Sequence, residues 1–244
     1  TSGTSGRPKA AMLTHRALLS NLDQLLRVTD PPPMLPDDVV LIVLPMFHIY
    51  ALNAALGLVA RCGATAVISD RFDPEGSLRM VQDHKVTNIA GAPPMYIAWS
   101  AIPNFANRMS SVRMLASGAA PLLPAVYQQF ASAGLTIWEG YGMTEASPVI
   151  TSAIVTGVSK AGSVGHPLPG VETKLVDDSG NEVEEGDPGE IIVRGPNLFS
   201  GYWPDGADGP DADGWFGTGD VAIADHEGDL RLVDRRRDLI LVSG

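Results

Sequence analysis

The sequence has almost no cysteine and no apolar stretch of membrane-spanning length. Cys62 is the only cysteine among 244 residues, which rules out an internal disulfide and fits a reducing compartment. The longest apolar run extends from about Ile49 to Ala60 and contains Asn53, so it is too short to cross a bilayer. No signal peptide is evident. We therefore expect a cytoplasmic protein.

Basic residues are scarce as well. The chain has 17 Lys and Arg against 28 Asp and Glu, a net charge of −11, which argues against nucleic-acid binding through a basic face. Residues 1–150 hold ten acids and ten bases, whereas residues 151–244 carry the entire excess of acids. Two regions of different character are therefore expected. With 45% hydrophobic residues, the chain can bury one large core or two modest ones.

Strand and helix patterns alternate through the first region. Leucines recur at helical spacing after Thr14, which is a candidate N-cap, as is Asp73 further along. The continuous apolar run Val39–Leu44 is typical of a strand buried on both faces. Further strands alternate with helices as far as Leu135–Trp138. This alternation predicts an α/β fold with a mainly parallel, Rossmann-like sheet and covering helices.

The pattern changes after about residue 150. Short strands are separated by turn residues such as Asp177–Asn181, and Asp225–Gly228 is typical of a hairpin turn. These signals predict a small antiparallel, barrel-like subdomain. We accordingly divide the chain into an α/β subdomain (residues 1–150), an antiparallel β subdomain (151–234) and a hinge segment (235–244).

The first nine residues suit a phosphate-binding loop. Glycines let the backbone approach an anion closely, and successive N–H groups can form a concave anion site. Hydroxyl side chains add donors, and Lys9 adds a mobile positive charge. The order differs from a Walker loop, which has Lys and then Ser or Thr directly after its second glycine, and a flexible polar loop is the alternative. The candidate phosphate-binding residues are Thr1, Ser2, Gly3, Thr4, Ser5, Gly6 and Lys9.

Two later loops follow predicted strands, at the edge where open parallel sheets bind ligands. In Ser117–Pro121, small residues let a flat base lie against the backbone. In the second loop, Tyr141 can stack on a base, Thr144 can donate to a phosphate, and Glu145 can hold Mg²⁺. A tight strand-to-helix connection and a turn with a core tyrosine are the alternatives. The candidates in these loops are Gly118, Ala119, Ala120, Glu139, Gly140, Tyr141, Gly142, Thr144 and Glu145.

Charged side chains near the end of the chain complete the set. Asp220 follows a Gly-rich turn, where its carboxylate could accept both hydroxyls of a ribose. The run Asp234–Asp238 supplies guanidinium groups, although such runs are more often solvated surface.

Together these motifs resemble those of the adenylate-forming (AMP-binding) enzymes: acyl-CoA synthetases, their luciferase relatives and peptide-synthetase adenylation domains. The resemblance covers essentially the whole chain, and motifs that are weak singly occur in the family's order. Pro45–Asn53 and Ser117–Pro121 look like the 4-coumarate:CoA ligase branch, whereas Val176–Val183 and Asp234–Gly244 look like bacterial long-chain fatty acyl-CoA ligases. The shared motifs are Thr1–Lys9, Tyr141–Glu145, Gly189–Ile191 running on to Gly201–Trp203, Thr218–Asp220 and Asp234–Arg235.

The resemblance implies an ATP-dependent reaction in two steps. A carboxylate attacks the α-phosphate of ATP to give an acyl-adenylate and pyrophosphate, and the thiol of CoA then displaces AMP. ATP, CoA and a fatty or aryl carboxylic acid would be the substrates, with Mg²⁺ as cofactor and peripheral membrane contact for the acyl substrate. An aryl-CoA ligase, an acyl-AMP ligase, an adenylation domain and an inactive nucleotide-binding module are the alternatives. The oligomeric state is not indicated.

The resemblance also implies a role for each candidate. Arg71 matches a position that can meet a phosphate of CoA. The catalytic candidates are Lys9, His48, Thr144 and Glu145. The opening loop with Lys9 and Thr144 would hold the phosphates, and Glu145 would hold Mg²⁺. Gly118–Ala120 and Tyr141 would enclose the adenine, and Asp220 and Arg235 would bind the ribose. Tyr50 and Ala54 would line the acyl pocket, with His48 at its junction with the nucleotide.

Some positions depart from the family pattern. Ser5 and Ala10 stand where the family usually has Thr and Gly, and Arg237 stands at the hinge in place of Lys or Asp. The segment 204–213 is compact and acidic, without the family's helical pattern. We expect the first part of the large domain, and the small C-terminal lid with its adenylation lysine, to lie outside this chain. The chain alone is therefore expected to bind adenine nucleotide weakly and to form essentially no acyl-CoA.

Overall fold

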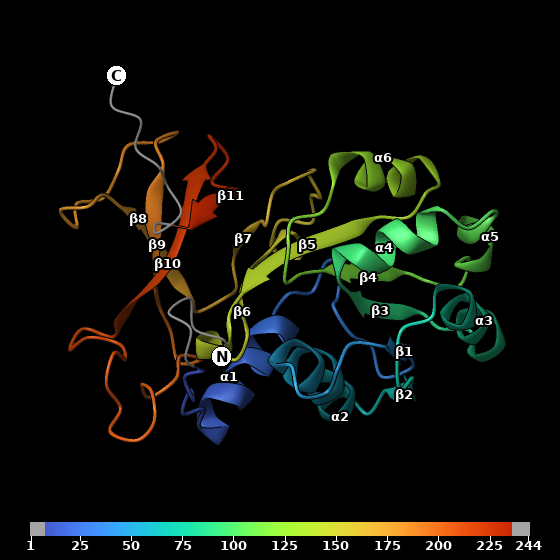
Figure 1. Ribbon diagram of the computed structural model, residues 1–244, viewed down its shortest axis with the longest axis horizontal. Helices are drawn as coiled ribbons and strands as arrows, with labels where there is room; N and C mark the ends of the chain where they lie inside the picture. The colour runs from blue at the N-terminus through green and yellow to red at the C-terminus, as the bar shows by residue number, and fades with distance from the viewer. Residues whose placement is uncertain (1–7, 236–244) are drawn as a thin grey trace.

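The computed structural model describes residues 8–235 and contains two β-sheets (Figure 1). The first sheet has seven strands in the order β2-β1-β3-β4-β5-β6-β7. Strands β1 to β5 run parallel, and β6 and β7 continue the sheet in antiparallel pairing. The strands are β1 (Val39–Ile42), β2 (Thr65–Ile68), β3 (Asn88–Gly91), β4 (Met114–Ser117), β5 (Ile137–Gly142), β6 (Val149–Ser152) and β7 (His166–Pro167).

Helices cover both faces of this sheet, with α1 and α2 on one side and α4 and α6 on the other (Figure 1). The helices are α1 (His15–Leu26), the π-helix η1 (Tyr50–Gly57), α2 (Leu58–Cys62), α3 (Pro74–His84), α4 (Pro93–Ser100), α5 (Phe105–Arg108) and α6 (Pro124–Ser132), with 3₁₀ turns η2 (Thr144–Ala146) and η3 (Ala153–Val155). Across residues 8–235, none of these helices combines the length and apolar character that a membrane span requires.

Alternation of side chains along the strands produces two separate cores. Val40 and Ile42 of β1 pack in the core shared with α1 and η1. Leu41 and Val43 pack in the other core, together with apolar residues of α3, α4, α5 and α6. Successive residues of a strand point to opposite faces, so the continuous apolar run predicted a strand covered on both sides, as observed.

Local sequence sets where two of the helices begin. The Thr14 hydroxyl accepts a hydrogen bond from the N–H of Ala17 (3.0 Å) at the start of α1. The Asp73 carboxylate accepts one from the N–H of Gly76 (2.5 Å) at the start of α3, where Pro74 occupies the first position. Both predicted N-caps are confirmed.

The second sheet is antiparallel, in the order β11-β10-β9-β8. The predicted α/β fold followed by an antiparallel subdomain is confirmed. Apolar residues Ile191, Val193 and Ala222 join the second sheet to the core under α1 and η1. Strands β6 and β7 belong to the first sheet, and the division of the chain at residue 150 stays a prediction. The strands are β8 (Glu172–Val176), β9 (Gly189–Arg194), β10 (Trp215–Ala224) and β11 (Leu230–Arg235).

Two strands are longer than the sequence predicted. Strand β5 continues through Gly142, because Gly140 and Tyr141 pair with β6. The sequence pattern predicts a strand over residues 221–224, whereas β10 begins at Trp215, because its first residues pair with β9. In both cases the partner strand extends a segment whose own glycines and aromatics gave no clear strand pattern.

Candidate functional site

The loops that follow β4 and β5 lie together at one edge of the first sheet. The two strands are parallel, with Ser117 opposite Glu139, so both loops leave at the edge where such sheets bind ligands. Tyr50, at the start of η1, reaches the same place. Its hydroxyl donates to the carbonyl of Ala116 (3.3 Å), and a Cβ at Gly118 would lie 3.5 Å from its ring. The predicted base-binding loop and the predicted acyl-pocket tyrosine are therefore neighbours.

The end of β4 and the loop after it have an unsatisfied polar atom and a strained residue. Ala119 has a φ of +72°, the left-handed region, which costs about 1 kcal/mol for a residue with a Cβ. The hydroxyl oxygen of Ser117 is buried and has no hydrogen-bond partner among the residues that the structure describes. Strain and unsatisfied buried groups are both typical of ligand-binding loops.

Three buried asparagines hold the turn that carries Thr144 and Glu145. This turn lies between β5 and β6 and contains η2. Each asparagine donates its side-chain amide to a backbone carbonyl of the turn or of the strand that follows it. Because the asparagines belong to distant segments, the backbone of the turn is fixed from several directions. The bonds run from Asn53 to Ser147 (2.7 Å), from Asn197 to Ala146 (2.8 Å) and from Asn21 to Val149 (2.8 Å).

Glu145 is a buried carboxylate with a phenol as its partner. Its side chain is 3% exposed, and its Oε1 accepts a hydrogen bond of 2.6 Å from the hydroxyl of Tyr202. Burial, reinforced by the Glu145 carboxylate, raises the pKa of Tyr202, so the phenol stays protonated and donates. Within residues 8–235, no hydrogen-bond donor reaches Oε2 of Glu145. A carboxylate with one oxygen available fits a hard divalent cation.

The chain around Lys9 is tied to the segment that contains Tyr202. The N–H of Met12 donates to the carbonyl of Gly201 (3.0 Å). Two residues away, the N–H of Trp203 donates to the carbonyl of Ala10 (2.8 Å). This pairing brings Lys9 to the neighbourhood of Glu145, although the two lie far apart in the sequence.

Tyr141 and Asp220 join the two sheets across the site. The hydroxyl of Tyr141 donates to Oδ2 of Asp220 at 2.6 Å. Tyr141 is 8% exposed and lies on β5, whereas Asp220 lies on β10, where the pairing with β9 is irregular between Gly217 and Val221. The predicted base-stacking ring and the predicted ribose-binding carboxylate therefore meet directly.

The irregular part of β10 is held by its neighbour β9. The side chain of Glu190 accepts a hydrogen bond from the N–H of Gly219 (3.1 Å), and the Thr218 hydroxyl donates to the carbonyl of Ile191 (2.8 Å). The N–H of Asp220 then donates back to the Thr218 hydroxyl (3.1 Å). The motifs Gly189–Ile191 and Thr218–Asp220 thus form one unit that fixes the backbone of Asp220.

Glu139 and His48 make contacts that the sequence did not indicate. The Glu139 carboxylate is buried and accepts hydrogen bonds from the N–H groups of Leu122 (3.3 Å) and Gly162 (3.1 Å), and burial raises its pKa. It therefore tethers two loops. His48 is exposed, and its Nδ1 accepts a hydrogen bond from the N–H of Tyr50 (3.2 Å). Their predicted roles toward nucleotide and acid stay predictions.

The remaining substrate candidates lie on or near η1 and β2. Ala54 is 9% exposed and packs in the core under α1. The helix that begins at Tyr50 is a π-helix, and within it the amide of Asn53 donates to the carbonyls of Leu18 and Ser147. Arg71 is exposed and follows β2 in the chain. Strand β2 lies three positions from β4 in the sheet, and this separates the two strands by roughly 14 Å at normal strand spacing.

Several predicted positions lie outside the described residues. These are Thr1, Ser2, Gly3, Thr4, Ser5 and Gly6 of the opening loop, and Arg237 at the predicted hinge. For Arg235 the structure gives the backbone, which pairs with Asp220 between β11 and β10.

Sequence reasoning missed the residues that support the predicted ones. In the sequence, Asn53 stands out only as a polar residue inside an apolar run, and Tyr202 is only one member of a family motif. Asn21 and Asn197 carried no signal, because the backbone carbonyls to which they donate at the turn lie more than 40 residues away along the chain.

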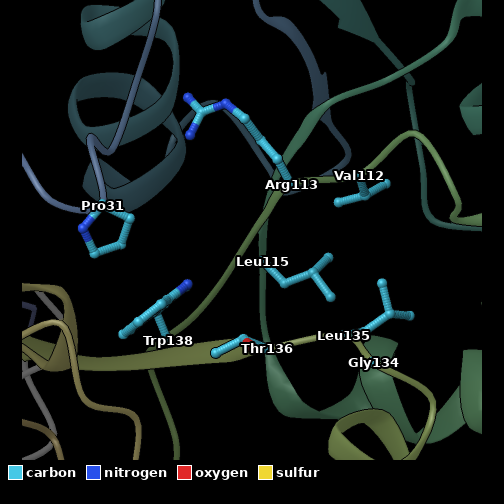
Figure 2. Close-up of a pocket in the computed structure, with 8 residues that line it drawn as sticks. All are labelled: Pro31, Val112, Arg113, Leu115, Gly134, Leu135, Thr136 and Trp138. Atoms are coloured by element: carbon cyan, nitrogen blue, oxygen red, sulfur yellow. The ribbon is translucent and has the colours of Figure 1, made fainter.

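A separate cavity of about 240 Å³ lies at the opposite edge of the sheet and contains none of the predicted site residues. Arg113 and Thr136, which line it, directly precede β4 and β5, so the cavity lies at the amino ends of these strands. Figure 2 shows the surrounding side chains, which are Pro31, Val112, Arg113, Leu115, Gly134, Leu135, Thr136 and Trp138.

Comparison with known proteins gives consistent matches. The family described as AMP-binding enzyme matches residues 1–203. A long-chain-fatty-acid–CoA ligase from Yersinia pestis is 38% identical over 249 residues, which cover 100% of this chain and 44% of the relative. A feruloyl-CoA synthase from Amycolatopsis sp is 39% identical over 250 residues, covering 100% of this chain and 50% of the relative.

A solved structure agrees with the architecture. ATP-bound MatB from Rhodopseudomonas palustris matches with a TM-score of 0.91 at 34% identity, over 99% of this chain and 48% of that chain. The chain therefore spans about half the length of the relatives that it matches.

Proposed function

The chain belongs to the AMP-binding enzyme family, and we propose that it activates a carboxylic acid with ATP and transfers the acyl group to CoA. Two relatives are CoA ligases by name, one for long-chain fatty acids and one for the aryl acid ferulate, and a third was solved with ATP bound. Because the chain spans about half of these relatives, the complete reaction is proposed for the intact protein.

One observation carries the proposal, namely the 2.6 Å hydrogen bond from Tyr141 to Asp220. It brings a ring that can stack on adenine within reach of a carboxylate that can accept the hydroxyls of the attached ribose. Glu145 follows on the same chain segment, just past the end of β5. These three side chains would contact the base, the ribose and the phosphates of one ATP molecule.

We propose that adenylation proceeds through positioning and charge stabilisation. A carboxylate oxygen of the acid attacks the α-phosphorus of ATP, and the bond to the bridging oxygen of pyrophosphate breaks. Thr144 donates to the α-phosphate, while Lys9 and the opening loop stabilise the departing pyrophosphate. Mg²⁺, which Glu145 would hold, would neutralise charge on the phosphate oxygens.

In the second step, the sulfur of CoA attacks the acyl carbonyl carbon of the acyl-adenylate. The bond between that carbon and the AMP oxygen breaks, the thiol proton passes to solvent, and thioester and AMP are released. His48 is our candidate at the junction of acid and nucleotide, and Arg71 is our candidate for a CoA phosphate. Arg235 would assist Asp220 at the ribose.

For the acid itself we propose a long-chain fatty acid, taken up by a cytoplasmic enzyme with peripheral membrane contact. Tyr50 contacts the Gly118 loop, so an acid held beside Tyr50 and Ala54 would lie next to the nucleotide. An aryl acid is the second candidate, because the feruloyl-CoA synthase is as similar to the chain as the fatty-acid ligase.

The test is pyrophosphate release by the intact protein across a panel of fatty and aryl acids, with and without CoA. Release that depends on a fatty acid, with thioester formed when CoA is present, is the expected result. Preference for cinnamate-type acids would favour the second candidate. Failure to bind a non-hydrolysable acyl-AMP mimic in isothermal titration would overturn both and leave a module without this activity.

A further inference from the structure

Tyr202 lies between the two charged groups on which the proposed reaction most depends. It belongs to the segment Phe199–Asp208, which contacts both of them. At one end, the N–H of Phe199 donates to the carbonyl of Glu145 (2.8 Å). At the other, the carboxylate of Asp208 pairs with Nζ of Lys9 (3.1 Å). Tyr202 itself contacts the side chains of both Glu145 and Lys9.

The hydroxyl of Tyr202 fixes one oxygen of Glu145. The 2.6 Å separation is that of a charge-assisted hydrogen bond. Because Glu145 is almost fully buried, its carboxylate depends on protein donors in place of water. Among the described residues, Tyr202 is the one side chain that donates to it. This bond limits the rotation of the carboxylate and leaves Oε2 for a metal ion.

The ring of Tyr202 holds Lys9 by a different interaction. Nζ of Lys9 lies 4.6 Å from the ring centre, within the range of a cation–π contact. The Lys9–Asp208 ion pair is exposed, with 42% and 73% of the two side chains accessible, and exposed pairs contribute little. The ring contact adds a restraint on the lysine from the same residue that binds Glu145.

We propose that Tyr202 is a positioning residue that keeps Lys9 and Glu145 apart and aligned, so that the ammonium is kept for the phosphates of ATP and the carboxylate for Mg²⁺. Without such a spacer, the two opposite charges would attract each other and pair directly. This inference rests on the proposed function, because it needs Glu145 as the Mg²⁺ ligand.

Two substitutions separate the two contacts. Tyr202→Phe removes the hydroxyl and keeps the ring, so it acts on Glu145 alone. Tyr202→Leu removes both contacts. A matched control is Tyr127→Phe on α6, because the Tyr127 hydroxyl also donates to protein oxygens, at Ser159 (2.8 and 3.0 Å), and Tyr127 is not among the site residues.

The experiment titrates a non-hydrolysable ATP analogue into the intact protein at stepped Mg²⁺ concentrations, by calorimetry, with pyrophosphate release measured in parallel. For Tyr202→Phe, the Mg²⁺ concentration that gives half-maximal analogue binding should rise about tenfold, while affinity at saturating Mg²⁺ stays as in the wild type. Tyr202→Leu should also weaken binding at saturating Mg²⁺, because Lys9 loses its contact with the ring. Tyr127→Phe should match the wild type.

Wild-type Mg²⁺ dependence in Tyr202→Phe would overturn the inference, and that variant decides the matter even if Tyr202→Leu fails to fold. Failure of the proposed function looks different. In that case the wild type itself shows no Mg²⁺-dependent analogue binding, or Glu145→Gln binds as the wild type does. A normal wild type, a defective Glu145→Gln and an unchanged Tyr202→Phe together would reject only the role of Tyr202.

Discussion

Buried carboxylates have different hydrogen-bond partners at the two edges of the seven-stranded sheet. The parallel strands begin at the amino edge and end at the carboxyl edge. At the amino edge, Asp38 is 2% exposed, and its oxygens accept hydrogen bonds from the Thr87 hydroxyl (2.7 Å) and from Arg113 (2.8 Å at Nε). At the carboxyl edge, Glu145 has one side-chain donor, Tyr202, among the described residues. Satisfied polar groups stabilise a fold, whereas partly satisfied ones are the groups that a ligand can use.

This difference gives each edge its own expected phenotype. Substitutions at the amino edge should lower the free energy of unfolding and leave nucleotide affinity alone. Substitutions at the carboxyl edge should change Mg²⁺ or ATP dependence with little effect on stability. The turn there is held by hydrogen bonds from the side chains of Asn53 and Asn197 to its backbone carbonyls, and these bonds remain when the site side chains are changed.

The largest effect is expected at Glu145. Glu145→Gln should lower Mg²⁺-dependent pyrophosphate release roughly 1000-fold, or about 4 kcal/mol, because a neutral amide is a poor ligand for a hard cation. The thermal unfolding midpoint should stay close to that of the wild type. Glu182→Gln, which changes an exposed glutamate paired with Lys174, is the control and should be fully active. Retained activity with normal Mg²⁺ dependence would remove Glu145 from the metal site.

At the amino edge, Asp38→Ala should lower the free energy of unfolding by about 3 kcal/mol, because it leaves Arg113 and Thr87 without their shared buried acceptor. Urea unfolding measures the change, and calorimetry with an ATP analogue should show wild-type affinity in the folded protein. A variant as stable as the wild type but weak in nucleotide binding would reverse the assignment of the two edges.

Asp220→Ala should raise the KM for ATP about 30-fold, which corresponds to about 2 kcal/mol for a lost charge-assisted pair of hydrogen bonds. The reason is the proposed ribose contact, together with loss of the acceptor for the Tyr141 hydroxyl. Asp83→Ala, at an exposed position on α3, serves as the control. An unchanged KM would exclude Asp220 from the nucleotide site.

Lowering the pH should reduce the free energy of unfolding through Asp38 at the amino edge. Burial alone would raise the pKa of Asp38, but hydrogen bonds from Arg113, Thr87 and Leu35 outweigh it and hold that pKa below its ordinary value. The stability that Asp38 contributes is therefore present above about pH 4, the unfolded value, and lost as pH falls through the lower folded pKa. Urea unfolding from pH 6 down to pH 2.5 should show a steeper acid loss for the wild type than for Asp38→Asn. Parallel curves would contradict this.

The smallest effect is expected at Asp208. Asp208→Asn removes the exposed ion pair with Lys9, which should contribute less than about 1 kcal/mol. The ATP KM should therefore change by less than about fivefold, and the Tyr202 ring should still hold the lysine. A loss as large as that of Asp220→Ala would show that Asp208, and not Tyr202, positions Lys9.

Much of the fold was predictable because its signals are local. The caps at Thr14 and Asp73 depend on residues three positions away, and the strand of Val39–Ile42 is a continuous apolar run. The loops of the candidate site could be proposed for the same reason, since their glycines, hydroxyls and acids are adjacent in the sequence. The π-helix at Tyr50 was not found, because it depends on bonds from Asn53 to two other segments.

By itself, the sequence determined the order of strands and helices, the places where loops interrupt them and the residue types that those loops present. Only the tertiary structure decided which side chains meet. Tyr202 reaches Glu145 across 57 positions, and Asn53 reaches Ser147 across 94. Such contacts depend on how whole strands and helices pack together, because a hydrogen bond forms only where two groups are brought within about 3 Å, and no spacing along one chain segment specifies that distance.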